Sequence, residues 1–201
     1  MKILISGFEP FGGYAENPSM ELVQALPDQF YNQISLVKTI LPVDNGQGPD
    51  HLVEKIYQFQ PDVVLAFGLA PMRQKINLER VAINLKDYRI SDNAGNQIID
   101  QPIIPEGPTA YFTSLPIRKM LTALTNANIP ASISLSAGAY LCNQVFYCMM
   151  HEIAIQNWPI RAGFIHLPGK QSPETPSEKM AYDLNQFIRA TKILCEVLIE
   201  S

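Results

Sequence analysis

Five short runs of apolar residues recur along the chain, and longer segments with a helical repeat lie between them. Each run is short and rich in aliphatic and β-branched side chains, which predicts buried β-strands rather than helices. The predicted strands are residues 2–7, 34–41, 63–67, 131–135 and 162–166.

The segments between these strands predict helices. Asn17 and Pro18 mark the start of the first, because a polar capping residue followed by proline is typical of a helix amino terminus. In the segment 115–126, Ile117, Met120 and Leu124 recur on one helical face. The other predicted helices are residues 49–58, the segment that carries Cys142, and residues from about 177 to 200.

Strands that alternate with helices predict an α/β fold. We expect a three-layer α/β/α arrangement with a twisted, mostly parallel central sheet. The segment 75–100 interrupts the alternation, because closely spaced apolar residues are followed there by the turn sequence Asp92-Asn-Ala-Gly-Asn96. This pattern predicts an added β-hairpin. No linker divides the chain, so residues 1–201 are expected to form a single domain.

Composition narrows the class of protein. The chain is 47% hydrophobic and 17% charged, which is typical of a globular domain. Its net charge of −4 argues against a nucleic-acid partner. The first apolar run is too short for a signal peptide or a membrane span, and three cysteines favour a reducing compartment, so we expect a cytoplasmic protein. The pattern of cysteines and histidines predicts no metal site.

The segment Ser136-Ala-Gly-Ala-Tyr-Leu-Cys142-Asn143 joins a predicted strand to an apolar helix. A thiol at such a junction lies beside unpaired backbone N–H groups and the positive end of the helix dipole. Both lower the pKa of a thiol and favour the thiolate. Cys142 is therefore a candidate nucleophile, and the protein is then an enzyme.

His166 is the favoured base among three histidines. Ligands of open α/β sheets gather at the carboxyl ends of the strands, where His166 and Cys142 are both expected. His151 lies on the same predicted helix as Cys142, about 13 Å further along its axis, and cannot reach the thiol. His51 lies near the start of a helix, where a solvated role is expected.

Glu79 is a candidate for the third group, which orients the imidazole in sites of this type. It is embedded in the apolar sequence Ile76-Asn-Leu-Glu-Arg-Val-Ala-Ile-Asn84, where a carboxylate is costly unless it is paired. An ion pair with Arg80 or another cation at the rim of the sheet explains the carboxylate equally well. Spacing leaves both interpretations open.

Several motifs together resemble pyroglutamyl-peptidase I, also called pyrrolidone-carboxylate peptidase, a family of cysteine peptidases. The resemblance covers nearly the whole chain and rests on the order and spacing of the motifs. They are Gly7-Phe-Glu-Pro-Phe-Gly-Gly13 with Asn17-Pro18, Pro61-Asp62, Glu79-Arg-Val-Ala-Ile-Asn84, Arg89 with Asp92-Asn93, Ala137-Gly138, Cys142-Asn143 and Phe164-Ile-His166.

The resemblance implies a Cys–His–Glu triad formed by Cys142, His166 and Glu79. This triad would hydrolyse the amide bond after an amino-terminal pyroglutamyl (5-oxoprolyl) residue through a thioester, without a metal or an organic cofactor. The substrates would be peptides with amino-terminal pyroglutamate, with no nucleic-acid or membrane partner. Relatives in this family resemble homotetramers. The whole chain, residues 1–201, would then be a single catalytic domain.

The resemblance also implies a pocket for the lactam ring, and it places Arg89 near the oxyanion. Phe8 and Phe11 would otherwise be interpreted as core residues that anchor a loop, and Asn17 either caps a helix or contacts the pocket. The implied substrate-binding residues are Phe8, Phe11, Asn17, Leu69, Ile90, Tyr140 and Leu141.

One segment departs from the family pattern. Many relatives have Gly-Gln followed by glycines where this chain has Gly68-Leu69-Ala70-Pro71-Met72. The change is expected to alter efficiency or the preference for the leaving peptide rather than the reaction class. It is also the only feature that favours an alternative function, a lactam-binding or acyl-binding protein without catalysis. Such a protein has no need of a complete triad.

Overall fold

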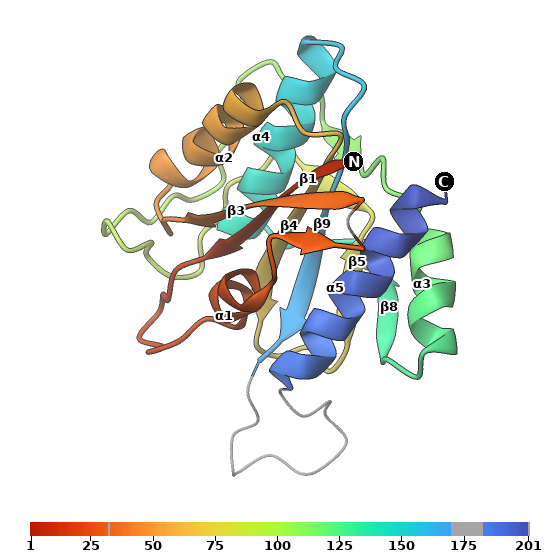
Figure 1. The fold of residues 1–201 in the computed structure, drawn as a ribbon. Coiled ribbons are helices and arrows are strands. Elements are labelled where there is room, and N and C mark those ends of the chain that lie inside the picture. Colours follow the sequence, from red (N-terminus) through yellow and green to blue (C-terminus); the bar gives the residue numbers. More distant parts are fainter. Residues whose placement is uncertain (32, 170–182, 201) are drawn as a thin grey trace.

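A seven-stranded mixed sheet forms the centre of the computed structural model, which describes residues 1–31, 33–169 and 183–200 (Figure 1). The strand order is β2-β3-β1-β4-β9-β5-β8. The strands are β1 (Lys2–Phe8), β2 (Gln29–Phe30), β3 (Ile34–Leu41), β4 (Val63–Ala70), β5 (Ile76–Glu79), β8 (Ala131–Ser134) and β9 (Arg161–Pro168).

Helices cover both faces of the sheet, which confirms the predicted three-layer α/β fold (Figure 1). One face packs against α1 (Pro18–Ala25), α3 (Ile117–Asn126) and α5 (Leu184–Ile199). The other packs against α2 (Gln47–Phe59) and α4 (Leu141–Ile155). The predicted residues 177–182 of the last helix lie outside the described part of the chain.

Alternation along the central strands decides which side chains enter which layer. In β9, Ile165 and Leu167 belong to the core beneath α1, α3 and α5, whereas Ala162 and Phe164 belong to the core beneath α2 and α4. Because side chains alternate between faces, His166 continues the second set. The polar His166 side chain therefore faces the layer formed by α2 and α4.

The central sheet is mostly parallel, with one reversal that matters for the site. Strands β3, β1, β4 and β9 run in one direction. Strand β5 is antiparallel to β9 and pairs Asn77 with His166, and β8 is parallel to β5. Strands β8 and β9 therefore run in opposite directions, and their carboxyl ends do not meet at one edge, contrary to the sequence-based expectation.

The added hairpin is present, but its strands differ from those that the sequence pattern suggested. Strand β6 (Val81–Ile83) pairs with β7 (Ala110–Phe112), which lies beyond the predicted segment. Strand β5 belongs to the central sheet, because Ile76 and Leu78 fill the core there. Across the turn after Asp92, pairing is limited to a bridge between Lys86 and Gln101 and a few loop hydrogen bonds.

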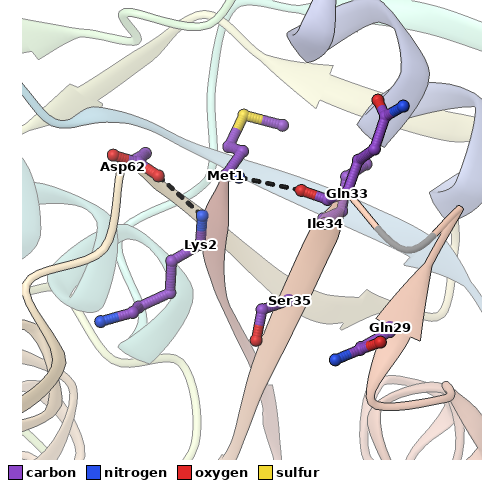
Figure 2. Close-up of a pocket in the computed structure, with 7 residues that line it drawn as sticks. All are labelled: Met1, Lys2, Gln29, Gln33, Ile34, Ser35 and Asp62. Carbon is purple, nitrogen blue, oxygen red and sulfur yellow. Dashed lines mark hydrogen bonds between the residues drawn. The ribbon is translucent and has the colours of Figure 1, made fainter.

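A hollow of about 350 Å³ lies at the amino-terminal ends of β1 and β3 (Figure 2). Its polar groups link the start of β1 to neighbouring segments by two hydrogen bonds. The amino terminus donates to the Gln33 carbonyl at 2.9 Å, and the Lys2 N–H donates to Asp62 Oδ2 at 2.6 Å. Among the described residues, no cysteine or histidine lines this hollow. Within the described residues, no helix has the length and hydropathy needed to span a bilayer.

Candidate active site

A smaller cavity, of about 250 Å³, opens where β4 and β9 end. It contains the candidate nucleophile and the candidate base together. Its lining residues come from the glycine-rich loop after β1, the end of β4 and the β4–β5 connection, the segment around Arg89, the β8–α4 connection with the start of α4, and β9. They are Phe11, Tyr14, Leu69, Ala70, Pro71, Arg73, Arg89, Ile90, Ala137, Gly138, Tyr140, Cys142 and His166.

His166 and Glu79 form a buried hydrogen-bonded pair. The imidazole is 4% exposed, the carboxylate is fully buried, and Nδ1 lies 2.8 Å from Glu79 Oε1. An ionised carboxylate only accepts hydrogen bonds, so Nδ1 carries the proton and Nε2 is the nitrogen able to act as a base. The Phe164 ring, with its centroid 4.9 Å from that of the imidazole, limits the orientation of the histidine further.

Arg73 is the cation that accompanies the buried Glu79. Its Nη1 lies 3.1 Å from Glu79 Oε1, while its Nη2 donates to the Ser136 carbonyl at 2.7 Å. The sequence left open an ion pair between Glu79 and Arg80 or another cation. The structure joins Glu79 to both His166 and Arg73, so the two interpretations of this carboxylate are compatible.

Cys142 is the second residue of α4 and lies beside the β4–β9 pair. A Cβ atom added to Gly68 would approach Cys142 Sγ to 2.8 Å, and Gly68 is the register partner of His166 on the neighbouring strand. The Cys142 thiol lies near Gly68 because residues 135–140 lead from the carboxyl end of β8 to the start of α4. Gly138, with a φ of +82°, supplies a left-handed turn within this segment.

The expectation of a lowered thiol pKa is wrong for the resting protein. Burial is the main cause that raises the pKa of Cys142, to about 12, and the Glu79 carboxylate raises it further. The thiol's own backbone N–H and Arg73 oppose this rise. Loss of solvation therefore outweighs the helix terminus, and the thiol is protonated at neutral pH. An attack on a carbonyl then requires a base, and His166 is placed on the same cavity.

The apolar side of the cavity consists of aromatic and aliphatic side chains. Phe11 packs against Tyr14 and Tyr140, with ring centroids 6.4 and 6.0 Å away. Ile90 and Leu69 complete this wall, and the exposed Arg89 lies at the same cavity. An uncharged, flat ligand group suits such a wall, because few of its side chains can solvate a charge.

Three of the suggested binding residues do not line the cavity. Phe8 and Leu141 are 2% and 1% exposed and belong to the core beneath α2 and α4. Asn17 is fully buried and caps α1: its Oδ1 accepts from the Ser19 N–H at 3.0 Å, and its Nδ2 donates to the Glu9 carbonyl at 3.0 Å. Asn17 thereby supports the loop that carries Phe11.

Asn93 and Glu9 connect the loops on two sides of the cavity. Asn93 Nδ2 donates to Glu9 Oε1 at 2.8 Å and to the Pro10 carbonyl at 2.9 Å. Glu9 Oε1 also accepts from the Val43 N–H at 3.0 Å. Burial alone would raise the pKa of Asp92, but the Asn96 side chain and the backbone N–H groups of Asn96, Asn45 and Ala94 donate hydrogen bonds to its carboxylate and hold the pKa below the usual value. The cavity walls are thus fixed by hydrogen bonds from side chains to the backbone and to one another.

The other two histidines make different contacts. His51 Nε2 lies 2.9 Å from Thr39 Oγ1. His151 Nδ1 lies 2.9 Å from the Tyr111 hydroxyl, and its ring stacks on Tyr147. Neither histidine lines the cavity that holds Cys142. In residues 1–31, 33–169 and 183–200, no group of three His, Cys, Asp or Glu side chains is placed to share a metal ion.

Sequence reasoning missed Arg73 and Tyr14, which both line the cavity. Arg73 has no motif of its own in this chain, and only its contact with the buried Glu79 draws attention to it. The signal available beforehand was the cost of burying a carboxylate, which requires a cation nearby. That rule does not say which arginine is the partner.

Known proteins are similar to this chain over most of its length. The Pyroglutamyl peptidase family model matches residues 1–200. A pyrrolidone-carboxylate peptidase of Vibrio vulnificus is 40% identical over 200 residues, covering 100% of this chain and 93% of the relative. One from Finegoldia magna is 48% identical over 168 residues, covering 84% of this chain and 78% of the relative.

Solved structures show the same similarity. A mutant pyrrolidone carboxyl peptidase from P. furiosus superposes with a TM-score of 0.93 at 38% identity, covering 100% of this chain and 99% of the other. Pyroglutamyl Peptidase I of Bacillus amyloliquefaciens gives a TM-score of 0.90 at 38% identity, covering 96% and 94%. With a family match over nearly its whole length and relatives of this identity, the chain belongs to the pyroglutamyl peptidase family.

Proposed function

We propose that this protein is a cysteine exopeptidase that removes amino-terminal pyroglutamate from peptides, with Cys142, His166 and Glu79 as its catalytic triad. The observation that carries this proposal is the buried 2.8 Å bond between His166 and Glu79 at the cavity that also contains the Cys142 thiol. Family membership supplies the reaction class, and the cavity supplies a site for an uncharged lactam.

Acylation begins with transfer of the thiol proton to His166 Nε2. Sγ then bonds to the carbonyl carbon of the pyroglutamyl residue, and the carbonyl oxygen becomes an oxyanion. Backbone N–H groups at the start of α4 and the Arg89 guanidinium are the candidate donors for this oxyanion. Glu79 stabilises the imidazolium that forms. The tetrahedral intermediate collapses when His166 returns the proton to the leaving amine, which departs as the shortened peptide.

Deacylation repeats these steps with water as the nucleophile. His166 takes a proton from water as its oxygen bonds to the thioester carbonyl. The carbon–sulfur bond then breaks, the thiol regains its proton, and free pyroglutamate leaves. Every proton that the imidazole accepts is thus returned within one cycle, and the enzyme ends in its starting state.

Specificity for the lactam follows from the chemistry of the cavity wall. Phe11, Ile90 and Tyr140 offer apolar surface to the faces of a small, uncharged ring. An amino-terminal glutamate would bring an ammonium and a carboxylate into the same space, and their desolvation would be costly. Leu69 and Pro71 also lie at the cavity, so the departure from the family pattern falls where it would affect the substrate.

The same proposal covers domain organisation, assembly and location. Residues 1–201 act as a single catalytic domain, because the cavity draws on elements from the first loop to β9. On the family resemblance the enzyme is a homotetramer, which sedimentation velocity would test. Its three free cysteines favour a cytoplasmic location.

The test is to incubate the purified protein with a pyroglutamyl peptide and to determine the product masses. We expect free pyroglutamate and a peptide shortened by one residue. The matched control is the same peptide beginning with glutamate, which should persist. Cys142→Ala should bind the pyroglutamyl peptide without cleaving it. Tight binding by the wild-type protein without any cleavage would instead support the alternative, a lactam-binding protein.

A further inference from the structure

We propose that Arg73 is a positioning residue for the triad. Its guanidinium favours the ionised form of Glu79, which lies behind His166, and it also binds the backbone of the segment that leads to Cys142. This inference rests on the proposed function for its kinetic readouts. Arg73 comes from the β4–β5 connection, which contributes none of the three triad side chains.

Glu79 has few other means of remaining charged. It is fully buried, and its Oε1 accepts from His166 at 2.8 Å and pairs with Arg73 at 3.1 Å. Its Oε2 is also buried and makes no hydrogen bond to any of the described residues. A buried carboxylate without adequate compensation takes up a proton, and a neutral carboxyl would no longer stabilise an imidazolium.

The second contact of Arg73 is with the backbone. Nη2 donates to the Ser136 carbonyl at 2.7 Å, six residues before the nucleophile. The guanidinium is planar, so its two nitrogens fix the separation between this carbonyl and the Glu79 carboxylate. Arg73 is 31% exposed, so its charge is partly solvated while its two contacts point inward.

Charge balance within the cavity favours this role. When His166 accepts the thiol proton, the site holds a thiolate, an imidazolium, the Glu79 carboxylate and the Arg73 guanidinium, which sum to zero. Without Arg73 the same group carries a net negative charge. The other charged or titratable groups at this cavity are Arg89, Tyr14 and Tyr140, and in the structure Glu79 pairs with the Arg73 guanidinium and is hydrogen-bonded to the His166 imidazole.

The two contacts can be separated by substitution. Arg73→Gln removes the charge, whereas Arg73→Lys keeps the charge but not the planar fork. We expect the acid limb of the kcat/KM profile of Arg73→Gln to lie at higher pH than that of the wild-type protein, because the guanidinium 3.1 Å away favours the ionised carboxylate. Arg73→Lys should keep the wild-type acid limb and lose roughly tenfold in kcat, with little change in KM.

Lys75→Gln is the matched control, since it removes one exposed positive charge from the same connection. Its pH profile should match that of the wild-type protein. An equal shift for Lys75→Gln and Arg73→Gln would overturn the proposal, as would an unshifted acid limb for Arg73→Gln. If Arg73→Gln fails to fold, Arg73→Lys remains decisive: an unchanged kcat or a displaced acid limb contradicts the proposal.

A second readout needs no peptidase activity. The rate at which iodoacetamide alkylates Cys142, followed by mass spectrometry across pH, reports the thiol and its base directly. We expect the pH dependence of this rate to shift in Arg73→Gln and not in Lys75→Gln. If the shift occurs while no pyroglutamyl peptide is cleaved by the wild-type protein, the proposed function fails and the positioning role stands. If neither variant shifts the alkylation profile, the positioning role is wrong.

Discussion

Gly68 faces the Cys142 thiol, and the space between them leaves no room for a side chain on the strand. An added Cβ would lie 2.8 Å from Cys142 Sγ and 2.8 Å from Phe164 Cζ. Gly68 pairs with His166 in the sheet. The absence of a side chain at one strand position therefore leaves the space beside Cys142 Sγ, at the cavity that His166 also lines.

Gly68→Ala should impair catalysis by displacing the thiol. Contacts under 3.0 Å are not tolerated by real Cβ atoms, so either Cys142 or Phe164 must move. We expect kcat/KM to fall by roughly 100-fold, since a displacement of about 1 Å costs that much in positioned chemistry. Steady-state kinetics of the folded variant measures this. Gly46→Ala is the control, because nothing tight surrounds that site, and it should keep near-normal activity.

His166 and Glu79 should differ in the size of their effects. His166→Ala removes the base for the protonated thiol and should leave almost no turnover. Glu79→Gln keeps a hydrogen-bond acceptor beside Nδ1 but cannot stabilise the imidazolium, so we expect kcat to fall by roughly 10- to 100-fold with little change in KM. Kinetics paired with thermal melts separates activity from folding. A folded Glu79→Gln enzyme with wild-type kcat would limit Glu79 to a structural role.

Much of the fold was predictable because it depends on local patterns. Apolar runs and helical periods gave the main strands, the flanking helices and the α/β class, since burial on both faces leaves a strong local signature. The pairing of β5 was not predictable in this way. Its residues Ile76 and Leu78 fit either a hairpin or a central strand, and only contacts with β8 and β9 decide between them.

The sequence singled out Cys142, His166 and Glu79, which the structure brings to one region, but it did not predict their electrostatics. The pattern around Cys142 correctly indicated a helix start, but the pKa of the thiol depends on how deeply the whole fold buries it. Likewise, the apolar surroundings of Glu79 showed that a partner was needed. The identity of that partner, Arg73, depends on how the β4–β5 connection turns back over the sheet.

Asn93→Ala should weaken substrate binding more than chemistry. Its side chain holds the loop that carries Phe11 through bonds to Glu9 Oε1 and the Pro10 carbonyl. Without these bonds the apolar wall of the cavity loses its fixed position, while the proposed triad is untouched. We expect KM to rise several-fold and kcat to stay within about twofold. Asn126→Ala, on the exposed side of α3, is the control. A fall in kcat with unchanged KM would contradict this role for Asn93.

Stability should fall steeply above pH 9. Burial raises the pKa of Cys142, Cys148 and Cys195 to about 12 in each case. Below the ordinary thiol pKa both folded and unfolded chains hold these protons, so the stabilising contribution is fully present. Between pH 9 and pH 12 the unfolded chain loses the protons while the folded chain keeps them, so stability falls as the pH rises.

The size of this effect can be measured at a single thiol. A fully retained proton lowers the free energy of unfolding by about 1.4 kcal/mol per pH unit. Cys195 is fully buried in the core beneath α5 and does not line the active-site cavity. Urea unfolding between pH 8 and 11 should therefore show a shallower slope for Cys195→Ala than for the wild-type protein. Val23→Ala, in the same core, should lower stability at every pH without changing the slope; equal slopes for all three proteins would mean that Cys195 ionises as readily in the folded chain as in the unfolded one.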